Sequence, residues 1–313
     1  MTPTTTHAAS LDTPFRTVLV TGATGKVGRH VVAGLLASSA QVSVRALVRD
    51  PAAADLPADV ELVAGDLTRP DTLADAAAGV DAVFLLWPGF DPEGAVATVT
   101  ALAGHGAHVV YLSAARLQGD DVGVMTGVWS VLERLVEDTT AAGGSHTMVR
   151  GGGFAGNTLE WAAEVRDGDT VHVVAPQGGR SLVHERDLAE VAVAALLDPA
   201  THAGRAYAVT GPQTLTQVEQ VAAIAEALGR PLRVEVVSHD DAVGERAALW
   251  GTAAAEQAVV HWESLVGQPE RVTHDTDDVL GRPALSFSEW ARDHVADFRE
   301  AAAIRGVAAI RAS

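Results

Sequence analysis

A glycine-rich segment near the start of the chain constrains the fold more than any other feature of the sequence. Gly22, Gly25 and Gly28 fall between an apolar stretch, residues 17–20, and an amphipathic stretch, residues 30–37. Glycines at this spacing between a strand and a helix allow a tight turn, a close approach of the backbone to a pyrophosphate, and close packing of the helix on the strand. The N-terminus of the helix then directs free N–H groups at the anion. The segment therefore predicts a dinucleotide-binding turn.

We expect six residues of this turn to contact the cofactor: Gly22, Thr24, Gly25, Lys26, Val27 and Gly28. An ordinary glycine-rich connection is the alternative, and the regular pattern that follows the turn disfavours it.

Short apolar or β-branched runs alternate with helical patterns through the first half of the chain. Strands are expected over residues 17–20, 42–48, 60–63, 82–86, 109–112 and 147–150, and helices over 30–37, 72–78 and 128–140. This alternation is typical of βαβ units with a parallel sheet. The predicted fold class is therefore α/β, a Rossmann-like doubly wound parallel sheet with a smaller C-terminal substrate-capping subdomain.

Three consecutive glycines after residue 150 interrupt the pattern. We expect a flexible tail over residues 1–15, a dinucleotide-binding core over 16–156, and the capping subdomain over 157–313, with a strand near 205–210 that returns to the sheet. The capping segment is expected to contain helices over 215–228, 240–266 and 287–304 and a strand over 232–237. Thr214 or Thr216, and Ser286 or Ser288, are the expected N-caps of two of these helices.

The composition excludes several classes of function. The chain contains no cysteine, which fits a reducing compartment and excludes disulfides, thiolate nucleophiles and cysteine-bound zinc. A formal net charge of −18 disfavours binding to nucleic acid or anionic lipid. The longest apolar stretches are too short to span a bilayer. We expect a soluble cytoplasmic protein, monomer or homodimer, that binds a small aromatic substrate, with no nucleic acid, membrane or metal partner.

The end of the second predicted strand bears on the choice of cofactor. An acidic residue at this place hydrogen-bonds the ribose of NAD, whereas an arginine accommodates the 2′-phosphate of NADP. Here Arg49 comes first, Asp50 follows it, and Arg45 precedes both in the strand. We therefore expect NADP(H). NAD(H), bound through Asp50, is the less favoured alternative, as is Arg49 serving only as a solvated charge.

Further candidate residues follow the other strands, because ligands of this architecture bind at the carboxyl ends of the strands. Asp66 and Leu67 are expected at the adenine ring. The segment that closes the fourth strand supplies Leu86, Trp87 and Pro88, and the fifth strand ends near Ser113. For Trp87, simple core packing is the alternative.

These residues resemble the atypical short-chain dehydrogenase/reductase superfamily and, within it, the NmrA-like group of NAD(P)-binding proteins and quinone reductases. The resemblance covers most of the chain. It is carried by the turn Thr21–Gly28, by residues 45–51, by Gly65-Asp66-Leu67, by residues 148–157, by residues 183–189 and 209–212, and by residues 281–290.

The resemblance implies further contacts. Residues 146–157 would pass near the nicotinamide, with Gly152 and Phe154 among the cofactor contacts, and the C-terminal helices would cap the substrate. It also implies that Asp187 holds a helix start, and we expect Asp187 to be the N-cap of the helix that runs to Leu197.

Most reductases of this superfamily protonate the product with a tyrosine whose pKa is lowered by a lysine four residues later. The chain lacks this pair: Tyr111 is followed at that spacing by Ala115, Tyr207 by Gly211, and Lys26 belongs to the turn. Where the pair is expected, the chain has Trp129 and Glu133. Glu133 could act as an acid only if burial raised its pKa enough to keep it protonated, and we interpret it instead as a charge on the surface of its helix.

Two functions are compatible with the absence of the tyrosine–lysine pair. One is an NADPH-dependent reductase of a ketone or quinone carbonyl in an aromatic, polyketide-type substrate, whose proton comes from substrate or water, with Ser113 as a minor hydrogen-bond donor. Such a substrate stabilises its own developing oxyanion. The alternative is a non-catalytic, NAD(P)-sensing regulator of the NmrA-like type. Sugar-nucleotide epimerisation is less favoured, because it ordinarily uses the same tyrosine and lysine.

Two weaker groups of residues remain. An apolar pocket built from Phe154, Trp161, Trp250 and Trp262 would favour an enzyme, although such aromatic residues are more often core. Two of the histidines, His105 and His108, are interpreted as solvated loop residues, and three more lie near predicted strand ends, where they can approach the cleft: His146, His172 and His184.

Overall fold

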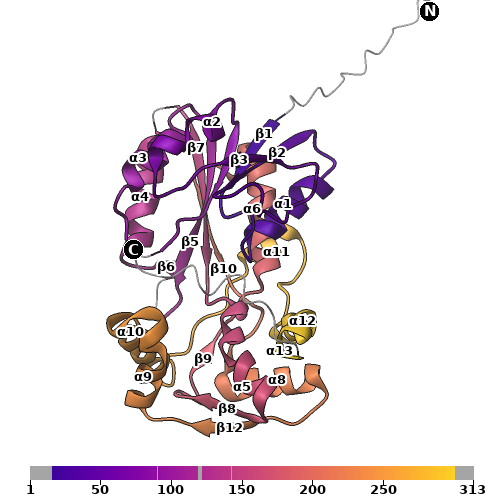
Figure 1. The fold of residues 1–313 in the computed structure, drawn as a ribbon, viewed down its shortest axis with the longest axis vertical. Helices are drawn as coiled ribbons and strands as arrows, with labels where there is room; N and C mark the ends of the chain where they lie inside the picture. The colour runs from indigo at the N-terminus through magenta and orange to yellow at the C-terminus, as the bar shows by residue number, and fades with distance from the viewer. Residues whose placement is uncertain (1–15, 90, 119–121, 142, 300–313) are drawn as a thin grey trace, which may run out of the picture.

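The core of the molecule is a sheet of parallel strands covered by helices on both faces (Figure 1). The computed structural model describes residues 16–89, 91–118, 122–141 and 143–299. The strand order is β10-β7-β5-β4-β1-β2-β3, every neighbouring pair in it is parallel, and the short β6 pairs antiparallel with β5. The order reverses between β1 and β4, which is the switch point of a doubly wound sheet. The predicted fold class is confirmed.

The elements of the core follow the predicted alternation closely. They are β1 (Arg16–Val20), α1 (Gly28–Ala37), β2 (Val42–Val48), β3 (Glu61–Ala64), the 3₁₀ helix η1 (Pro70–Thr72), α2 (Ala74–Ala77), β4 (Ala82–Leu85), α3 (Ala95–Ala103), β5 (His108–Arg116), β6 (Gly123–Val124), α4 (Val128–Thr140), β7 (Ser145–Gly151), α6 (Glu185–Leu197), α7 (Pro199–His202), β10 (Arg205–Val209) and α11 (Asp275–Leu280).

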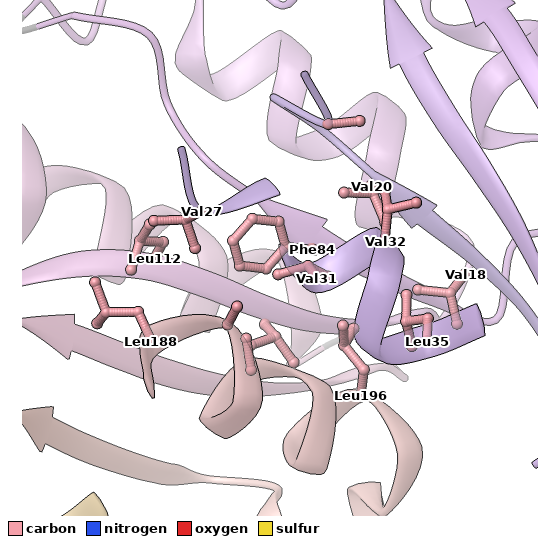
Figure 2. Close-up of a cluster of buried hydrophobic side chains, with 14 of the residues drawn as sticks. Val18, Val20, Val27, Val31, Val32, Leu35, Phe84, Leu112, Leu188 and Leu196 are labelled. Atoms are coloured by element: carbon pink, nitrogen blue, oxygen red, sulfur yellow. The ribbon is translucent and has the colours of Figure 1, made fainter. Parts of the chain in front are cut away.

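One face of the sheet packs against α1 and α6. Figure 2 shows this cluster, to which the strands contribute Val18, Val20, Phe84 and Leu112, and the turn and helices contribute Val27, Val31, Val32, Leu35, Leu188 and Leu196. Alternate residues of a strand point to opposite faces, so the intervening strand residues belong to the other layer. This alternation, present in the sequence, determines which side chains α1 meets.

The other face of the sheet packs against α2, α3 and α4 (Figure 1). Leu19, Leu85, Tyr111 and Met148 point into this layer from four strands. Helix α4 presents a stripe to them at a spacing of four residues, namely Val128, Leu132 and Val136.

The remaining elements form a smaller lobe beyond the carboxyl ends of the strands (Figure 1). They are the 3₁₀ helix η2 (Ala155–Trp161), α5 (Ala162–Asp167), β8 (Thr170–Val173), β9 (Gly179–Arg180), β11 (Leu215–Thr216), α8 (Gln217–Leu228), β12 (Arg233–Val236), α9 (His239–Trp250), α10 (Thr252–Ser264), α12 (Phe287–Asp293) and α13 (Val295–Arg299). Strands β8 and β12 pair in parallel, and β9 and β11 pair antiparallel. We call this part the cap.

The cap has a hydrophobic core of its own. Trp290, Phe287 and Phe298 pack there against Trp161 and against residues of α8. Helices α6 and α11 lie within residues 157–313 but pack with α1 and β10 on the sheet. Strand β10 returns to the sheet beside β7. The boundary at residues 156 and 157 stays a prediction, and the predicted tail over residues 1–15 lies outside the described residues.

Two predicted helices differ from those in the structure. The helix expected over 240–266 is two helices, α9 and α10, because Gly251 between them has φ 81°, a left-handed conformation that interrupts a helix and favours glycine. The helix expected over 287–304 divides into α12 and α13 at His294, and residues 300–304 lie outside the described part of the chain.

Helix caps were predicted with mixed success. Thr216 and Ser286 each form a capping box with a glutamate three residues later, as expected from the alternatives at each helix start. The prediction for Asp187 is wrong, because the N-cap of α6 is His184, whose side chain accepts from Arg186 N–H. Asp187 lies in the first turn of α6, is fully buried, and accepts from Leu285 N–H and Arg282 Nη2, both at 2.7 Å. It ties the segment before α12 to the core.

No helix in the part of the chain that the structure describes is both long and apolar enough to cross a membrane.

A second polar tie joins the cap to α6. Glu185, the first residue of α6, is buried, and its Oε1 lies 2.8 Å from His294 Nε2. Burial by itself raises the pKa of Glu185, but the hydrogen bond and charge of His294 outweigh burial and lower that pKa to about 2. Burial lowers the pKa of His294, and Glu185 and Asp297 reverse the effect and raise it.

We expect the Glu185–His294 pair to stabilise the fold most in mildly acidic solution. The raised pKa of His294 contributes stability that is complete below about pH 6.5 and is lost as the pH rises through the folded-state value. The lowered pKa of Glu185 contributes stability that is complete above about pH 4.5 and is lost as the pH falls toward 2. The difference in Tm between the wild type and His294→Gln should therefore be largest near about pH 5.5 and small by about pH 9. A difference that does not change with pH would contradict this assignment.

Candidate active site

The turn between β1 and α1 has the geometry of a phosphate cradle. Gly22 has φ 61°, and Gly25 N–H donates to Gly22 O at 2.9 Å. A Cβ on Gly28 would lie 2.1 Å from Gly22 O and 2.9 Å from Ala23 Cα, so the first residue of α1 must lack a side chain. A dinucleotide pyrophosphate fits a turn of this kind, whose backbone is open to close approach at a helix N-terminus.

Thr21 fixes the turn to the neighbouring strand. Its N–H donates to Phe84 O at 3.0 Å, and its hydroxyl accepts from Leu86 N–H at 2.8 Å. The carboxyl ends of β1 and β4 are thereby held together at the switch point of the sheet. Thr21 is fully buried. The sequence analysis placed Thr21 in the turn but gave it no role.

Lys26 connects the turn to the cap. Its Nζ donates to Gly156 O, in η2, at 2.8 Å, and the negative charges of Glu185 and Asp297 act on it. Thr24, Gly25 and Lys26 are exposed on the turn, whereas Val27 packs into the core cluster with α6. The turn therefore presents polar groups on its outer side and an apolar anchor on its inner side.

The end of β2 exposes both residues on which the cofactor preference depends. Asp50 Oδ1 accepts from Ala52 N–H at 3.0 Å, which commits this carboxylate to a local turn. Arg49 is exposed and has no hydrogen-bond or ion-pair partner among the described residues. Arg45, which also weighed toward NADP(H), is engaged elsewhere: it pairs with Glu61 at 2.9 Å and donates to carbonyls at the end of α2. Arg49 alone is free to meet a phosphate here.

The two residues expected at the adenine ring already have contacts within the protein. Asp66 Oδ1 accepts from the N–H and hydroxyl of Thr68, at 2.9 and 2.8 Å, and closes its own turn. Leu67 is buried in the layer with α3, and its carbonyl accepts from Thr98 at 2.7 Å. Both residues follow β3 at the cofactor edge of the sheet, and their contact with adenine stays a prediction.

The segment after β4 leaves the sheet beside the turn. Leu86 is half-buried and Pro88 is exposed. Trp87 is buried in the α3 layer, with its Nε1 donating to Asp91 O at 2.8 Å. The contacts of Trp87 are thus those of a core residue, the alternative noted from the sequence.

The triple-glycine segment after β7 is packed tightly by its neighbours. Gly152 N–H donates to Val209 O at 2.9 Å, and Gly153 lies so close to Arg180 that a Cβ would be 2.0 Å from its Nη2. Phe154 forms a parallel bridge with Val183 and packs on the α6 layer. The glycines allow β7 and the cap residue Arg180 to meet closely at one edge of the sheet.

Ser113 lies near the carboxyl end of β5 and is buried. Its hydroxyl has no hydrogen-bond partner among the described residues. A buried hydroxyl left unpaired costs about 1–3 kcal/mol, so a partner supplied by a bound molecule would relieve this cost. Tyr111 lies two residues earlier and points into the same layer, packed near α4.

The interpretation of Glu133 as a surface charge is wrong. Glu133 lies on α4 beside the apolar stripe, its side chain is 5% exposed, and Arg150 of β7 pairs with it through Nε at 2.9 Å and Nη2 at 2.7 Å. The sequence analysis recorded Arg150 only as part of a motif. Spacing could not show the pair, because its two members lie on different elements and meet only when α4 packs on the sheet.

Tyr111 is not suited to donate a proton. Burial raises the pKa of Tyr111 above its ordinary value, and the negative charge of Glu133 raises it further. An acid catalyst of the usual kind needs the opposite shift. This edge of the sheet therefore contains a fixed cation, Arg150, and an unpaired hydroxyl, Ser113.

The predicted aromatic pocket is not assembled as expected. Phe154 packs on the core layer, Trp161 lies in the cap core, and Trp262 lies beneath Arg246, whose guanidinium carbon is 4.8 Å from the ring centroid. The side chain of Trp250 lies outside what the structure describes.

The histidines also differ from expectation. His105 is exposed, but His108 is buried in β5, where Ser145 and Thr147 bond its ring and burial lowers its pKa to about 4. His146 begins β7 at the opposite edge of the sheet, and His172 lies in β8 of the cap. Among the three proposed for the cleft, only His184, which caps α6, acts electrostatically on a residue of α1, His30.

Comparison with known proteins identifies the nucleotide-binding part of the chain. A family model described as NAD(P)H-binding matches residues 22–199. These residues begin at the first glycine of the turn and extend through β7 and α6.

Two curated relatives align over nearly their whole lengths. A (4-alkanoyl-5-oxo-2,5-dihydrofuran-3-yl)methyl phosphate reductase of Streptomyces griseus is 37% identical over 286 residues, covering 90% of this chain and 99% of the relative. An NAD(P)H azoreductase of Xenophilus azovorans is 34% identical over 290 residues, with coverage of 90% and 99%. Among solved structures, an NADPH-dependent quinone oxidoreductase of Escherichia coli matches with a TM-score of 0.71 and 20% identity, covering 88% of this chain and 98% of that one.

We expect Gly28→Ala to weaken NADPH binding at least about tenfold, because the new Cβ would have to displace the backbone of Gly22 and Ala23 that forms the cradle. The measurement is the Kd for NADPH by fluorescence titration. Gly34→Ala is the matched control on the same helix, since its Cβ would meet only the Val193 side chain, at 3.1 Å. Equal Kd values for the two variants would show that the cofactor does not use this turn.

Proposed function

This chain belongs to the NAD(P)H-binding family as an atypical short-chain dehydrogenase/reductase of the NmrA-like group, and we propose that it is an NADPH-dependent reductase of conjugated aromatic carbonyl compounds. The substrate we propose is a ketone or quinone of the polyketide type. The observation that carries the proposal is the preformed phosphate turn with Arg49 unpaired at the end of the neighbouring strand, at an edge without a tyrosine–lysine pair.

Different residues of the chain would bind different parts of the cofactor. The backbone of the turn holds the pyrophosphate, and Lys26 adds a positive charge beside it. Arg49 binds the 2′-phosphate, which favours NADPH over NADH, because Asp50 is committed to Ala52. Asp66, Leu67 and the segment Leu86–Pro88 would line the adenosine end, with Trp87 packed behind it in the core, and Gly152 and Phe154 would line the nicotinamide end. Bound NADPH supplies the hydride.

Neither Tyr111 nor Lys26 is suited to donate the proton that completes the reduction. Tyr111 holds its proton too tightly, and Lys26 belongs to the turn. Ser113 can donate a hydrogen bond to the substrate oxygen, and the proton itself comes from water or from a hydroxyl of the substrate. A site of this kind favours substrates whose own conjugation stabilises the negative oxygen.

The names of similar proteins support one feature of this substrate class, the conjugation of the acceptor. A dihydrofuranone phosphate, an azo compound and a quinone are named as acceptors of three different similar proteins. All three are conjugated acceptors, and none depends on an isolated aliphatic ketone.

We expect NADPH oxidation with quinones and ortho-hydroxyaryl ketones at least about tenfold faster than with aliphatic ketones of similar size, because only the former delocalise the developing charge. The assay follows absorbance at 340 nm across a panel that includes an azo dye. Tight NADPH binding with no turnover of any acceptor would instead favour the NAD(P)-sensing regulator.

Arg49→Ala should remove most of the preference for NADPH while leaving NADH use nearly unchanged, because only NADPH carries the 2′-phosphate. Loss of one charge-assisted pair corresponds to about 1.5–3 kcal/mol, roughly 10- to 150-fold in kcat/KM for NADPH. Asp50→Asn is the control, since its amide oxygen can still accept from Ala52. An unchanged NADPH/NADH ratio in Arg49→Ala would exclude the assigned role.

A further inference from the structure

The Glu133–Arg150 ion pair fixes the orientation of the Arg150 guanidinium. Glu133 uses both carboxylate oxygens on one edge of the guanidinium, through Nε at 2.9 Å and Nη2 at 2.7 Å. Such a two-point contact fixes the plane as well as the position of the group. The Glu133 side chain is 5% exposed and that of Arg150 is 23% exposed. The carboxylate is therefore enclosed, whereas the Arg150 side chain is partly exposed.

The guanidinium retains unused donors. An arginine carries five N–H groups, and the contact with Glu133 takes one from Nε and one from Nη2. No hydrogen bond from Nη1 joins it to any other described residue. A pair that served only to join α4 to β7 would not need a cation with donors left over, because apolar residues of similar volume stabilise such contacts as well or better.

Arg150 and Ser113 are neighbours at the same edge of the sheet. They are direct register partners in the parallel pair β5–β7. Tyr111 and Met148, each two residues earlier, both point into the α4 layer, so Ser113 and Arg150 point to that same face. Near the carboxyl ends of adjacent strands, a residue with an unpaired hydroxyl and a residue whose guanidinium has unused donors thus occupy neighbouring positions on the same face.

We propose that Arg150 stabilises the negative charge that develops on the substrate oxygen, that Ser113 donates a second hydrogen bond to it, and that Glu133 is a positioning residue that holds Arg150. This inference rests on the proposed reductase function and names the residues that replace the usual tyrosine and lysine. Two donors directed at one oxygen form the kind of site that stabilises oxyanions in other enzymes.

The step balances without an acid on the protein. The hydride would leave the nicotinamide carbon of NADPH with the electron pair of its C–H bond, giving NADP⁺, and would add to the carbonyl carbon. The electron pair of the C=O bond then moves to oxygen, and water protonates that oxygen afterwards, releasing hydroxide. The hydrogen bond to Glu133 raises the pKa of Arg150 further above its ordinary value. The guanidinium therefore remains charged at every working pH, and it supplies charge and hydrogen bonds rather than a proton.

The first experiment replaces the cation. Arg150→Met should lower kcat about 10²- to 10³-fold, the usual effect of losing one oxyanion donor, while the Kd for NADPH by fluorescence changes less than threefold. Arg150→Lys, which keeps a charge but not the planar donors, should recover at least tenfold of this loss. Arg282→Met is the matched control, because it removes a guanidinium from another buried carboxylate, Asp187, outside the site.

The control separates catalysis from stability. We expect Arg282→Met and Arg150→Met to lower Tm by comparable amounts, with kcat affected only in Arg150→Met. Equal kcat in both folded variants would overturn the proposal, as would a methionine variant no slower than the lysine variant.

A binding measurement makes the test independent of turnover. The probe is 2-hydroxy-1,4-naphthoquinone, which carries an ionised oxygen at neutral pH, titrated against the NADP⁺-loaded protein by tryptophan fluorescence. Binding should weaken at least tenfold in Arg150→Met, less in Arg150→Lys, and not at all in Arg282→Met. Undiminished binding in Arg150→Met would overturn the proposal even if that variant turned over too slowly to assay.

The outcomes distinguish this inference from the proposed function. Turnover by the wild type together with an Arg150-independent kcat would retain the reductase and reject the oxyanion site. Arg150-dependent probe binding without turnover of any acceptor would retain the anion site and reject the reductase. Glu133→Gln, which leaves one carbonyl oxygen for Arg150, should lower kcat less than Arg150→Met without changing KM, as expected of a positioning residue; an unchanged kcat would remove Glu133 from the proposal.

Discussion

The contact between the first residue of α1 and the carbonyl of Gly22 is the constraint on which the rest of the site depends. Helix α1 can approach β1 this closely only because Gly28 has no side chain. The approach directs the free amides of the helix start at the switch point of the sheet, and Thr21 holds the end of β4 at the same point through Leu86. The cradle therefore exists before any ligand binds, so binding need not order this segment.

In an acidic chain, the arrangement of the few cations determines where anions can bind. Most arginines near the sheet are engaged: Arg45 bonds Glu61 and the end of α2, and Arg282 bonds Asp187 and Glu190. Arg49 and the outer edge of Arg150 are the exceptions in the described part of the site. They lie at opposite ends of the expected cofactor path, one after β2 and the other at the end of β7. This separation matches the two places where a reductase must hold negative charge, the 2′-phosphate and the reacting oxygen.

The character of the active edge has a consequence for substrate choice. A tyrosine of lowered pKa can protonate an isolated alkoxide, whereas a guanidinium can only stabilise charge until water reacts. Tyr111 is close to the site but is held in its neutral form by burial and by Glu133. Under the proposed function, the chemistry that remains favours acceptors whose conjugation delocalises the developing negative charge.

The fold class, the phosphate turn and most strands can be predicted from the residues alone, because they follow from local spacing: glycines at a strand–helix junction, and a period of two or of about 3.6 residues. The same local patterns limit the capping residues of α8 and α12 to two candidates each. The polar partners, in contrast, become visible only once the elements are packed together. Glu133 and Arg150 are 17 positions apart, and Asp187 and Arg282 are 95 positions apart. From the sequence, a charged residue beside an apolar stripe is predicted to lie on the surface. Whether it is buried depends on how the helix is rotated about its axis against the sheet, and packing across the whole layer, not a local pattern, sets that rotation.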